Sequence, residues 1–447
     1  MALKDKTKII FHNGLKTIGG TLIEIRHNDS RIFFDFGSVF DPSLENQPES
    51  FSKLIETNTI NYVEGLYDPR LTFDSLNDSE TTYSNEGVFI SHAHLDHSKL
   101  INYLNPSIPL YSSNKTKKFI DLLNINNEFL YPYEKNQDTK SRFTREIIGI
   151  KPNDKVSIGE IEVKFISVDH DIIGSCGLLI TTPTAKIAYS GDLRLHGYKK
   201  EDTINFCLES EDSDILIIEG VSVSSYEVGS VEEELKQTSE IDLVKDIIKI
   251  LKENPNSQIS FNYYIGNVER VYHIAKLAEP YRKVVLEEFH AFILKKLTGL
   301  EVLYYSISDK NYGLDPNKQI HILDLLNDSN NFFWQLESGL LKYIEQIKPG
   351  GIYIHSNAEP FGPYDPNYEP FFELLNNKKI ESKVLSCSGH GYTKDLMRII
   401  NWIRPKILCP IHSFHPERLY NLYGERILPE KGEMLELINK EENTNEF

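Results

Sequence analysis

The sequence predicts a layered fold of the α/β or α+β class, and three observations support this prediction. Short runs rich in β-branched and aromatic residues alternate with segments of helical period along the whole chain. The 447 residues, 40% of them hydrophobic, are enough for large cores in two or three domains. No apolar run approaches the roughly 20 residues that span a bilayer, so we expect a cytoplasmic protein without membrane segments.

The expected strands fall into two groups that differ in their connections. Most early strands follow one another through short turns, as in an antiparallel sheet. From about residue 230, strands alternate with helical segments such as residues 241–253, which is typical of a βαβ unit. Residues 41–85 are polar and too long for a turn, so they are a candidate substrate-facing loop. The expected strands are residues 21–25, 31–35, 88–92, 162–167, 186–190, 214–219, 258–263, 351–354, 383–386 and 406–410.

Charge and cysteine content exclude several classes of protein. The 66 acidic and 48 basic residues give a net charge of −18, which excludes a protein that coats nucleic acid through a generally basic surface. The four cysteines contain no CxxC pair and are too few for a disulfide scaffold, which indicates a reducing compartment. Any bound metal must therefore be held by histidine and carboxylate side chains.

The strongest motif is SHAHLDH at residues 91–97, directly after the apolar run GVFI. Because strand side chains alternate with period two, His92 and His94 project to one face at the end of the strand. The following turn can bring Asp96 and His97 towards the same cavity. Imidazole and carboxylate ligands at this spacing suit borderline metals such as zinc, with open positions for water. The alternative, a polar surface loop, does not account for four ligand-type side chains in six positions after a buried strand.

Two further ligand candidates follow predicted strands. His170 follows EVKFISV, and Asp192 lies in AYSGD, where Gly191 permits a tight turn. A carboxylate at Asp192 could bridge two metals about 3.5 to 4 Å apart, which together clamp a phosphoryl or acyl group. Taken alone, each residue is more often a turn or capping residue, so the interpretation depends on the ordered set.

The series FFDFG, HAHLDH, DHDIIGS and YSGD in the first 220 residues resembles the metallo-β-lactamase fold. The resemblance implies a four-layer αββα sandwich with a dinuclear zinc site at the edge of its sheets. Asp35 would orient the histidine loop without binding an ion. The implied ligands are, for one zinc, His92, His94 and His170, for the other, Asp96 and His97, and, as a bridge, Asp192.

Three later motifs resemble those of the β-CASP nucleases, in which a further domain is inserted before the closing strands. SDILIIEG ends in Glu219, LSCSGHGYTKDL presents His390, and ILCPIHSFH presents His412. The resemblance implies that His390 is the general acid and that Glu219 fixes its tautomer and favours the protonated ring. His412 would complete the second zinc. The alternatives are a glutamate in an exposed turn, a histidine beside a helix cap and a histidine satisfied within the core.

A histidine at position 412 resembles the RNA-cleaving branch of the β-CASP enzymes, since DNA-processing members usually carry an apolar residue there. The segment SNAEPFGPY is similar to the SQGEP-like loop of ribonuclease J. This similarity implies that Ser356, Asn357 and Glu359 lie near the RNA phosphate channel, the alternative being an ordinary Pro- and Gly-rich loop. The chain is therefore identified as a divergent member of the ribonuclease J-like family.

Several residues depart from the ribonuclease J pattern. Asp171 and Ile172 stand where a serine and a proline usually follow the histidine of the third motif. Glu219 replaces an aspartate, GHG replaces GHA, and Ser413 stands where glycine is common. The sequence ends soon after KGEMLEL, the expected closing strand, so we expect no C-terminal dimerisation domain and leave the oligomeric state open. The expected domains are residues 1–222 and 379–447, two parts of the metallo-β-lactamase fold, and residues 223–378, the inserted β-CASP α/β domain.

The sequence thus predicts a zinc-dependent phosphodiesterase that hydrolyses single-stranded RNA through a hydroxide held by two zinc ions, with manganese as the alternative metal. Its expected catalytic residues are Asp96, Glu219 and His390. One alternative is a dinuclear zinc hydrolase of DNA, a cyclic nucleotide or a small ester or thioester. Another is an inactive RNA-binding member, which the complete ligand set argues against. The sequence does not distinguish endonucleolytic from exonucleolytic cleavage.

Overall fold

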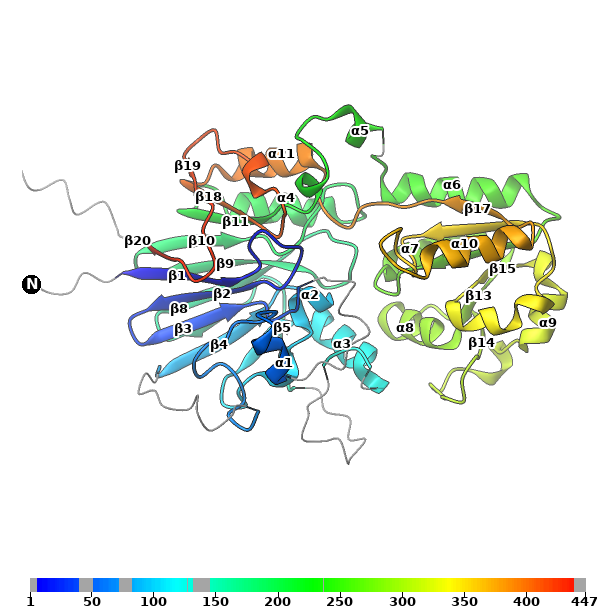
Figure 1. The fold of residues 1–447 in the computed structure, drawn as a ribbon, viewed down its shortest axis with the longest axis horizontal. Helices are drawn as coiled ribbons and strands as arrows, with labels where there is room; N and C mark the ends of the chain where they lie inside the picture. The colour runs from blue at the N-terminus through cyan, green and yellow to red at the C-terminus, as the bar shows by residue number, and fades with distance from the viewer. Residues whose placement is uncertain are drawn as a thin grey trace, which may run out of the picture. The chain divides into compact units, whose positions relative to one another are not determined.

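The computed structural model describes residues 6–39, 51–71, 83–126, 128–131, 145–235 and 237–437, which form two compact units (Figure 1). The chain leaves the first unit, builds most of the second, and then returns to complete the first. Within the described residues, no helix combines the length and the apolar character needed to cross a membrane. The first unit comprises Met1–Leu195, Lys199–Lys236 and Gly389–Phe447, and the second comprises His196–Tyr198 and Gln237–Ser388.

The first unit contains two seven-stranded sheets. In the first sheet the order is β20-β1-β2-β3-β4-β5-β6, with antiparallel pairing from β20 to β3 and parallel pairing from β3 to β6. The change of direction follows from the long connection between β3 and β4, which lets the chain cross over. The strands of the first sheet are β1 (Thr7–Asn13), β2 (Leu22–His27), β3 (Ser30–Phe34), β4 (Asn85–Ile90), β5 (Leu110–Ser113), β6 (Ile148–Ile150) and β20 (Met434–Leu437).

The second sheet has the order β19-β18-β11-β10-β9-β8-β7. Strands β10, β11 and β18 are neighbours and run parallel, so their carboxyl ends meet at one edge of the sheet. The strands of this sheet are β7 (Lys155–Ile158), β8 (Ile161–Ser167), β9 (Cys176–Thr182), β10 (Ala185–Tyr189), β11 (Ile215–Glu219), β18 (Ile407–Ile411) and β19 (Glu425–Arg426).

Apolar side chains hold the two sheets and their covering helices together. Phe34 of the first sheet stacks on Tyr189 of the second, with ring centroids 4.4 Å apart, inside one continuous core. Helix α3 packs on β5 and β6, while α4 and α11 pack together beside the other sheet. This helix–sheet–sheet–helix layering confirms the predicted metallo-β-lactamase fold class. The helices of this unit are α1 (Phe51–Glu56), α2 (Leu95–Ser98), α3 (Asn114–Leu123), α4 (Lys200–Glu209), α5 (Val231–Glu234) and α11 (Thr393–Ile403).

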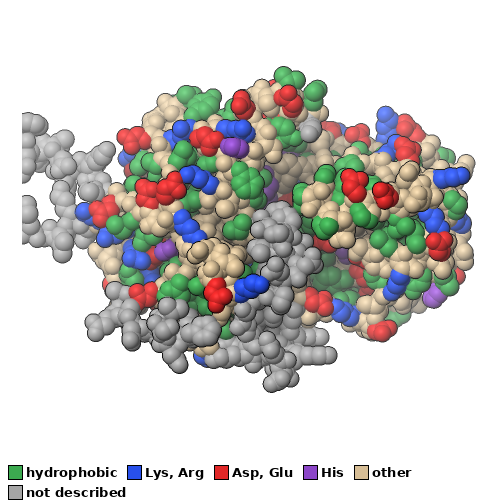
Figure 2. Space-filling view, in the orientation of Figure 1, with side chains coloured by type: hydrophobic (Ala, Val, Ile, Leu, Met, Phe, Trp, Pro, Cys, Tyr) green, Lys and Arg blue, Asp and Glu red, His purple; other side chains and the backbone are tan. Residues whose placement is uncertain are grey.

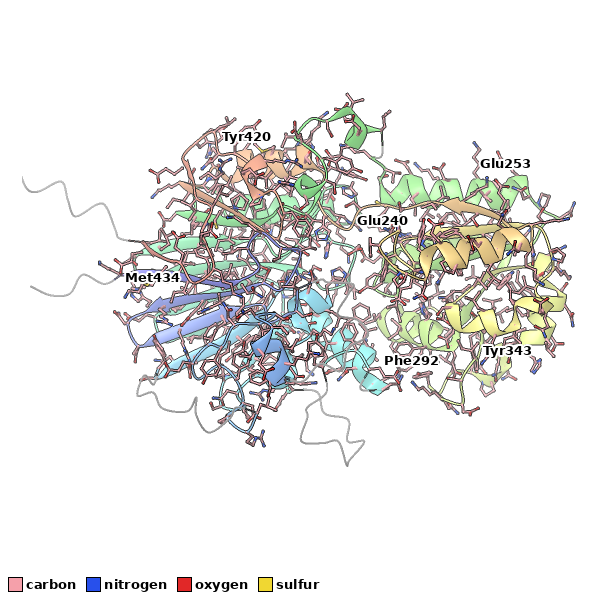
Figure 3. The ribbon with its side chains drawn as sticks, in the orientation of Figure 1. Glu240, Glu253, Phe292, Tyr343, Tyr420 and Met434 are labelled. Carbon is pink, nitrogen blue, oxygen red and sulfur yellow. The ribbon has the colours of Figure 1, made fainter. Side chains whose placement is uncertain are left out.

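The second unit is a parallel sheet with the order β14-β13-β15-β12-β16-β17. Helix α6 buries one stripe that includes Leu243, Ile247 and Leu251, and Glu240 and Glu253 mark its two ends in Figure 3. Parallel pairing through helices confirms the predicted βαβ organisation. Its elements are α6 (Glu240–Glu253), β12 (Ile259–Tyr263), α7 (Val268–Ala278), β13 (Lys283–Glu287), α8 (Glu288–Thr298), β14 (Leu303–Tyr305), α9 (Ile322–Asn327), β15 (Phe332–Gln335), β16 (Ile352–Ser356), α10 (Tyr368–Asn377) and β17 (Glu381–Val384).

The structure differs from the sequence predictions in two respects. Each predicted strand is present, but strands such as β9 and β13 were not expected, because short apolar runs do not distinguish a buried strand from a buried helix. The candidate substrate-facing loop at 41–85 lies partly outside the described residues. Its described part contains α1 and buries Phe51, Leu54 and Tyr67, so this part contributes to the core rather than to an open loop.

Candidate metal centre

The HAHLDH segment follows β4 and continues into the short helix α2. His92 and His97 are completely buried, and α2 carries both Asp96 and His97. The backbone N–H of Phe36 donates to the carbonyl of His97 at 2.8 Å, which fixes the segment against the end of β3. A Cβ at Gly37 would lie 1.9 Å from the carbonyl oxygen of Asp96, so only glycine permits this approach.

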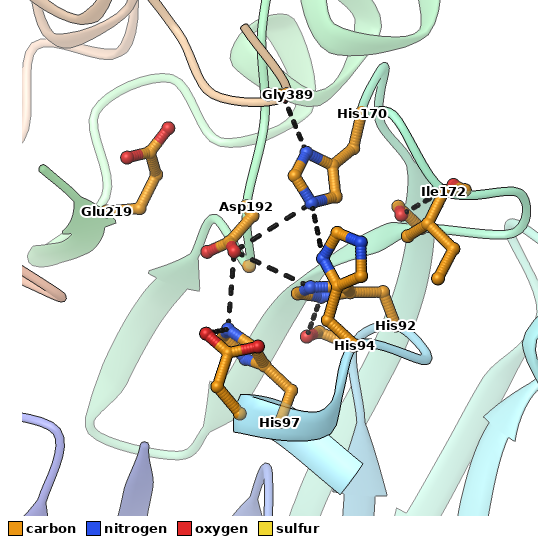
Figure 4. Close-up of polar contacts among 12 residues, drawn as sticks. His92, His94, His97, His170, Ile172, Asp192, Glu219 and Gly389 are labelled. Carbon is orange, nitrogen blue, oxygen red and sulfur yellow. Dashed lines mark hydrogen bonds and ion pairs between the residues drawn. The ribbon is translucent and has the colours of Figure 1, made fainter. Parts of the chain in front are cut away.

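One group of four ligand-type side chains gathers around the end of β4 (Figure 4). His170 Nε2 lies 3.1 Å from His94 Nδ1 and 3.8 Å from Asp192 Oδ2. His92 Nε2 lies 3.5 Å from the same Asp192 oxygen. The members of this first ligand group are His92, His94, His170 and Asp192.

A second group shares Asp192 with the first. Its Oδ2 lies 3.3 Å from His97 Nε2, and its Oδ1 lies 3.1 Å from His412 Nδ1. Asp96 Oδ2 closes the group at 3.2 Å from His412 Nε2. The structure thus brings together all seven side chains predicted as ligands, in two sets joined by one carboxylate. The members of this second ligand group are Asp96, His97, Asp192 and His412.

Unpartnered buried atoms test whether these residues fit a metal. Four atoms of the two groups are buried and make no hydrogen bond within the described part of the chain. Such atoms are costly unless a cation or a water molecule satisfies them. Imidazole nitrogen and carboxylate oxygen are donors that suit borderline divalent metals, so the groups are compatible with metal binding. The four atoms are His92 Nε2, His97 Nε2, His412 Nε2 and Asp192 Oδ2.

Asp35 lies behind the histidines and accepts several hydrogen bonds. Its Oδ2 accepts from His97 Nδ1 at 2.7 Å, from Ser91 Oγ at 2.9 Å and from the Tyr189 hydroxyl, while its Oδ1 accepts from the Ser91 backbone N–H. Because the Asp35 carboxylate can only accept, Nδ1 of His97 carries a proton, and in the neutral ring the lone pair is then on Nε2, which faces the second ligand group. Ser91 Oγ also lies 2.9 Å from His92 Nδ1, which leaves Nε2 of His92 facing the first group.

Burial and opposing charges shift the titration of these groups in different directions. Burial lowers the pKa of His92 well below its usual range, which keeps the imidazole in the neutral form that binds metals. Burial also opposes charge on His412, but Asp192 and Asp96 outweigh it and raise the pKa of His412 to about 10. Burial would raise the pKa of Asp192, yet the surrounding histidines hold it well below its usual range. Asp192 is therefore ionised and available as a bridging ligand.

Two predicted residues of the later motifs lie at neighbouring strand ends, and the third, His390, lies in the turn before α11. Glu219 ends β11, and His412 follows β18 with φ = 53°. His390 Nδ1 lies 3.5 Å from Glu219 Oε2 and 3.7 Å from Asp192 Oδ2, with 21% of its side chain exposed. Glu219 also accepts hydrogen bonds from the backbone N–H groups of Val221 and Gly391 at 2.8 and 3.1 Å. Because β10, β11 and β18 are adjacent and parallel, residues far apart in the sequence meet at this edge.

The predicted substrate-binding residues belong to the second unit. Ser356 ends β16 and is completely buried, and Glu359 is exposed. Arg270 donates to Ser356 Oγ at 3.2 Å and to Asn357 Oδ1 at 2.7 Å, and forms an ion pair with buried Glu240. Ser356 and Asn357 are thus held by internal hydrogen bonds, and their contact with a substrate stays a prediction.

Two features of the first ligand group were not predicted as part of the site. The backbone carbonyl of Gly389 accepts a hydrogen bond from His170 Nδ1 at 2.7 Å, and a backbone group carries no signal in residue type. The carboxylate of Asp171 lies beside His94 and His170, although the sequence marked Asp171 only as a departure from a family pattern. Its place directly after a candidate ligand was the available signal.

We expect Asp35→Asn to weaken metal binding by about 10–100-fold. Both oxygens of Asp35 accept hydrogen bonds, Oδ1 from the Ser91 backbone N–H and Oδ2 from His97 Nδ1, so either orientation of the asparagine amide turns its NH2 group towards another donor. Competitive titration against a coloured chelator measures this affinity at each site, with the exposed Asp121→Asn on α3 as the control. Unchanged affinity at both sites would contradict a positioning role for Asp35.

Comparisons with known proteins find a matching family model, curated relatives and a similar solved structure. Residues 63–257 match the model of the beta-lactamase superfamily domain. Ribonuclease J from Mycoplasma genitalium is 23% identical over 92% of this chain and 68% of its own length. Ribonuclease J from Thermus thermophilus is 22% identical over 59% of this chain, which spans about half (47%) of that relative. A crystal structure of a protein of unknown function from Enterococcus faecalis is 43% identical, with a TM-score of 0.88, covering 97% of this chain and all of that chain.

Proposed function

Because this chain belongs to the metallo-β-lactamase superfamily as a divergent, ribonuclease J-like β-CASP member, we propose that it is a metal-dependent ribonuclease acting on single-stranded RNA. One observation supports the proposal most directly: two ligand groups share Asp192, and His390 stands 3.7 Å from that carboxylate. A nuclease needs both a place for paired cations and a proton donor beside it.

We propose that the two ligand groups hold two zinc ions, with manganese as the alternative. When bound, such ions activate water for attack on phosphorus and neutralise charge on the phosphodiester. Asp96 is a proposed ligand of the second group, where its Oδ2 lies 3.2 Å from His412 Nε2, and its predicted place in the catalytic set rests on that ligand role. The proton that the leaving oxygen needs must come from a protein side chain.

His390 is the proposed general acid, which donates a proton to the leaving oxygen. Burial lowers the pKa of His390, but the nearby carboxylates of Glu219 and Asp192 outweigh burial and raise it above its ordinary value of 6.5. The ring is therefore more often protonated at neutral pH than a free histidine. Its partly exposed side chain leaves it accessible to a substrate.

The net charge of −18 does not rule out a nucleic-acid substrate. On the face shown in Figure 2, the Lys and Arg side chains lie among Asp and Glu side chains rather than in one broad patch. Binding would therefore depend on local positive charge at a metal-loaded site rather than on the average field of the protein.

Cleavage assays with matched substrates test the proposal. The full chain is stripped with a chelator, reloaded with zinc or manganese, and incubated with 5′-labelled single-stranded RNA, with DNA of the same sequence, and with a small thioester. We expect cleavage of RNA that requires added metal. Two bound metals without RNA cleavage would contradict the ribonuclease assignment, and cleavage of the DNA or the thioester instead would favour a hydrolase of that substrate.

We expect Glu219→Gln to shift the alkaline side of the pH–rate profile to lower pH. Activity requires protonated His390, so it falls as pH rises through the pKa of that ring. Removing the Glu219 carboxylate removes a cause of the raised pKa, so the ring loses its proton at lower pH. Measuring kcat between pH 5 and 10 for both proteins, with Glu253→Gln as a control, checks this direction. An unmoved alkaline limb would show that Glu219 does not set the protonation of His390.

A further inference from the structure

Asp171 brings a carboxylate to the first ligand group without belonging to its four members. Its Oδ1 lies 3.4 Å from His94 Nε2 and 3.4 Å from His170 Nε2. The Oδ1 atom is buried and makes no hydrogen bond within the described residues. A buried carboxylate oxygen without a donor is expensive, so its position calls for a compensating interaction.

The proton positions on the two histidines indicate what that interaction is. His170 Nδ1 donates to the carbonyl of Gly389 at 2.7 Å, so the neutral ring presents a lone pair at Nε2 and has no proton to give to Asp171. His94 Nδ1 lies 3.1 Å from this lone pair. If both nitrogens bind one cation, the proton of neutral His94 must be on Nε2, the atom that lies near Asp171 Oδ1.

We infer that Asp171 is a positioning residue, which selects the His94 tautomer that presents Nδ1 to the ion. The inference rests on the metal centre of the proposed function. Asp35 makes the equivalent contact with His97 in the second group, at 2.7 Å. Histidines that bind metals usually donate their other N–H to a carboxylate or a carbonyl, which fixes the ring and strengthens the ligand. His94, His97 and His170 would then each have such an acceptor, in Asp171, Asp35 and the Gly389 carbonyl.

Gly389 makes this arrangement possible by leaving space. A Cβ at position 389 would lie 2.6 Å from Cγ and Oδ2 of Asp171. Gly389 does not adopt a positive φ, so alanine at this position would act through steric displacement rather than backbone strain. We expect Gly389→Ala to push Asp171 away from His94 and to weaken metal binding in the same direction as removal of the carboxylate.

Metal titration of the full chain tests the inference without using catalysis. Wild type, Asp171→Ala and Asp171→Asn are titrated with zinc and with manganese against a competing chelator, with the exposed Asp246→Ala as the control. We expect Asp171→Ala to weaken one of the two sites by about 10–100-fold. Asp171→Asn should weaken it less, because its amide oxygen can accept the same proton. Long-range ¹⁵N–¹H NMR of the zinc-loaded wild type should show His94 protonated at Nε2.

The possible results separate the inference from the function on which it rests. Wild-type affinity at both sites in Asp171→Ala would overturn the inference and leave the metal centre intact. Equal losses for Ala and Asn, larger for manganese than for zinc, would also overturn it by showing that Asp171 is itself a ligand. A wild type that binds fewer than two zinc ions would contradict the proposed centre, and the inference with it.

Discussion

Asp192→Asn is expected to lose tight binding of at least one metal ion and to reduce RNA cleavage to background. Asp192 is the one side chain present in both ligand groups of the described residues, and its Oδ2 lies 3.3 Å from His97 Nε2 and 3.5 Å from His92 Nε2. An asparagine has one neutral oxygen and cannot bridge two cations as a carboxylate does. We expect affinity to fall by more than the roughly 100-fold that loss of a hydrogen-bonding partner of a ligand produces.

Metal content after dialysis and calorimetric titration with zinc measure the effect of Asp192→Asn. The exposed Asp154→Asn is the matched control for the same chemical change on the surface. Circular dichroism establishes whether the variant is folded. Two tightly bound zinc ions in a folded Asp192→Asn protein would exclude a bridging role for this residue.

His390→Ala is expected to keep both metals but to slow RNA cleavage by about 10²–10⁴-fold, the usual range for loss of a general acid. His390 belongs to neither ligand group, and its ring instead faces the carboxylates of Glu219 and Asp192 at 3.5 and 3.7 Å. The slow step in the variant should be departure of an unprotonated ribose oxygen. An activated p-nitrophenyl phosphodiester, whose leaving group needs no proton, should lose much less activity.

Comparing the two substrates distinguishes proton donation by His390 from a role in binding or in shaping the site. His415→Ala is the control, because His415 is partly exposed, belongs to neither ligand group and pairs with Glu417 at 3.0 Å. Equal losses on RNA and on the activated ester would argue for a role in binding or in shaping the site. Loss of a metal ion in His390→Ala would instead identify His390 as a ligand.

The residue pattern predicted a layered α/β fold and most members of the two ligand groups, because ligand chemistry is visible in residue types placed at strand ends. The four-layer order and the ligand role of His412 were implied by the family resemblance. His92, Asp192 and His412 each follow an apolar strand, and β10, β11 and β18 lie side by side in the structure. Strand adjacency then brings together residues more than 200 positions apart.

Other parts of the site depend on information that residue types do not carry. The Gly389 carbonyl acts through its backbone, and the place of Asp171 beside His94 depends on the path of the chain after β8. Ser356 was predicted from a loop motif, yet its burial follows from its place at the end of β16, a strand with neighbours on both sides. Tertiary packing decides such features, and a single sequence shows only local pattern.

The split of the first unit also has a consequence for synthesis on the ribosome. His92, His94, Asp96 and His97 emerge early, whereas His412 emerges only after the whole stretch Gln237–Ser388 has been made. At about 5–20 residues per second, translation of those residues takes on the order of 10–30 s. Throughout that interval the second ligand group lacks His412, and β1 has not yet paired with β20. A nascent chain therefore cannot assemble the complete second ligand group until translation has passed His412.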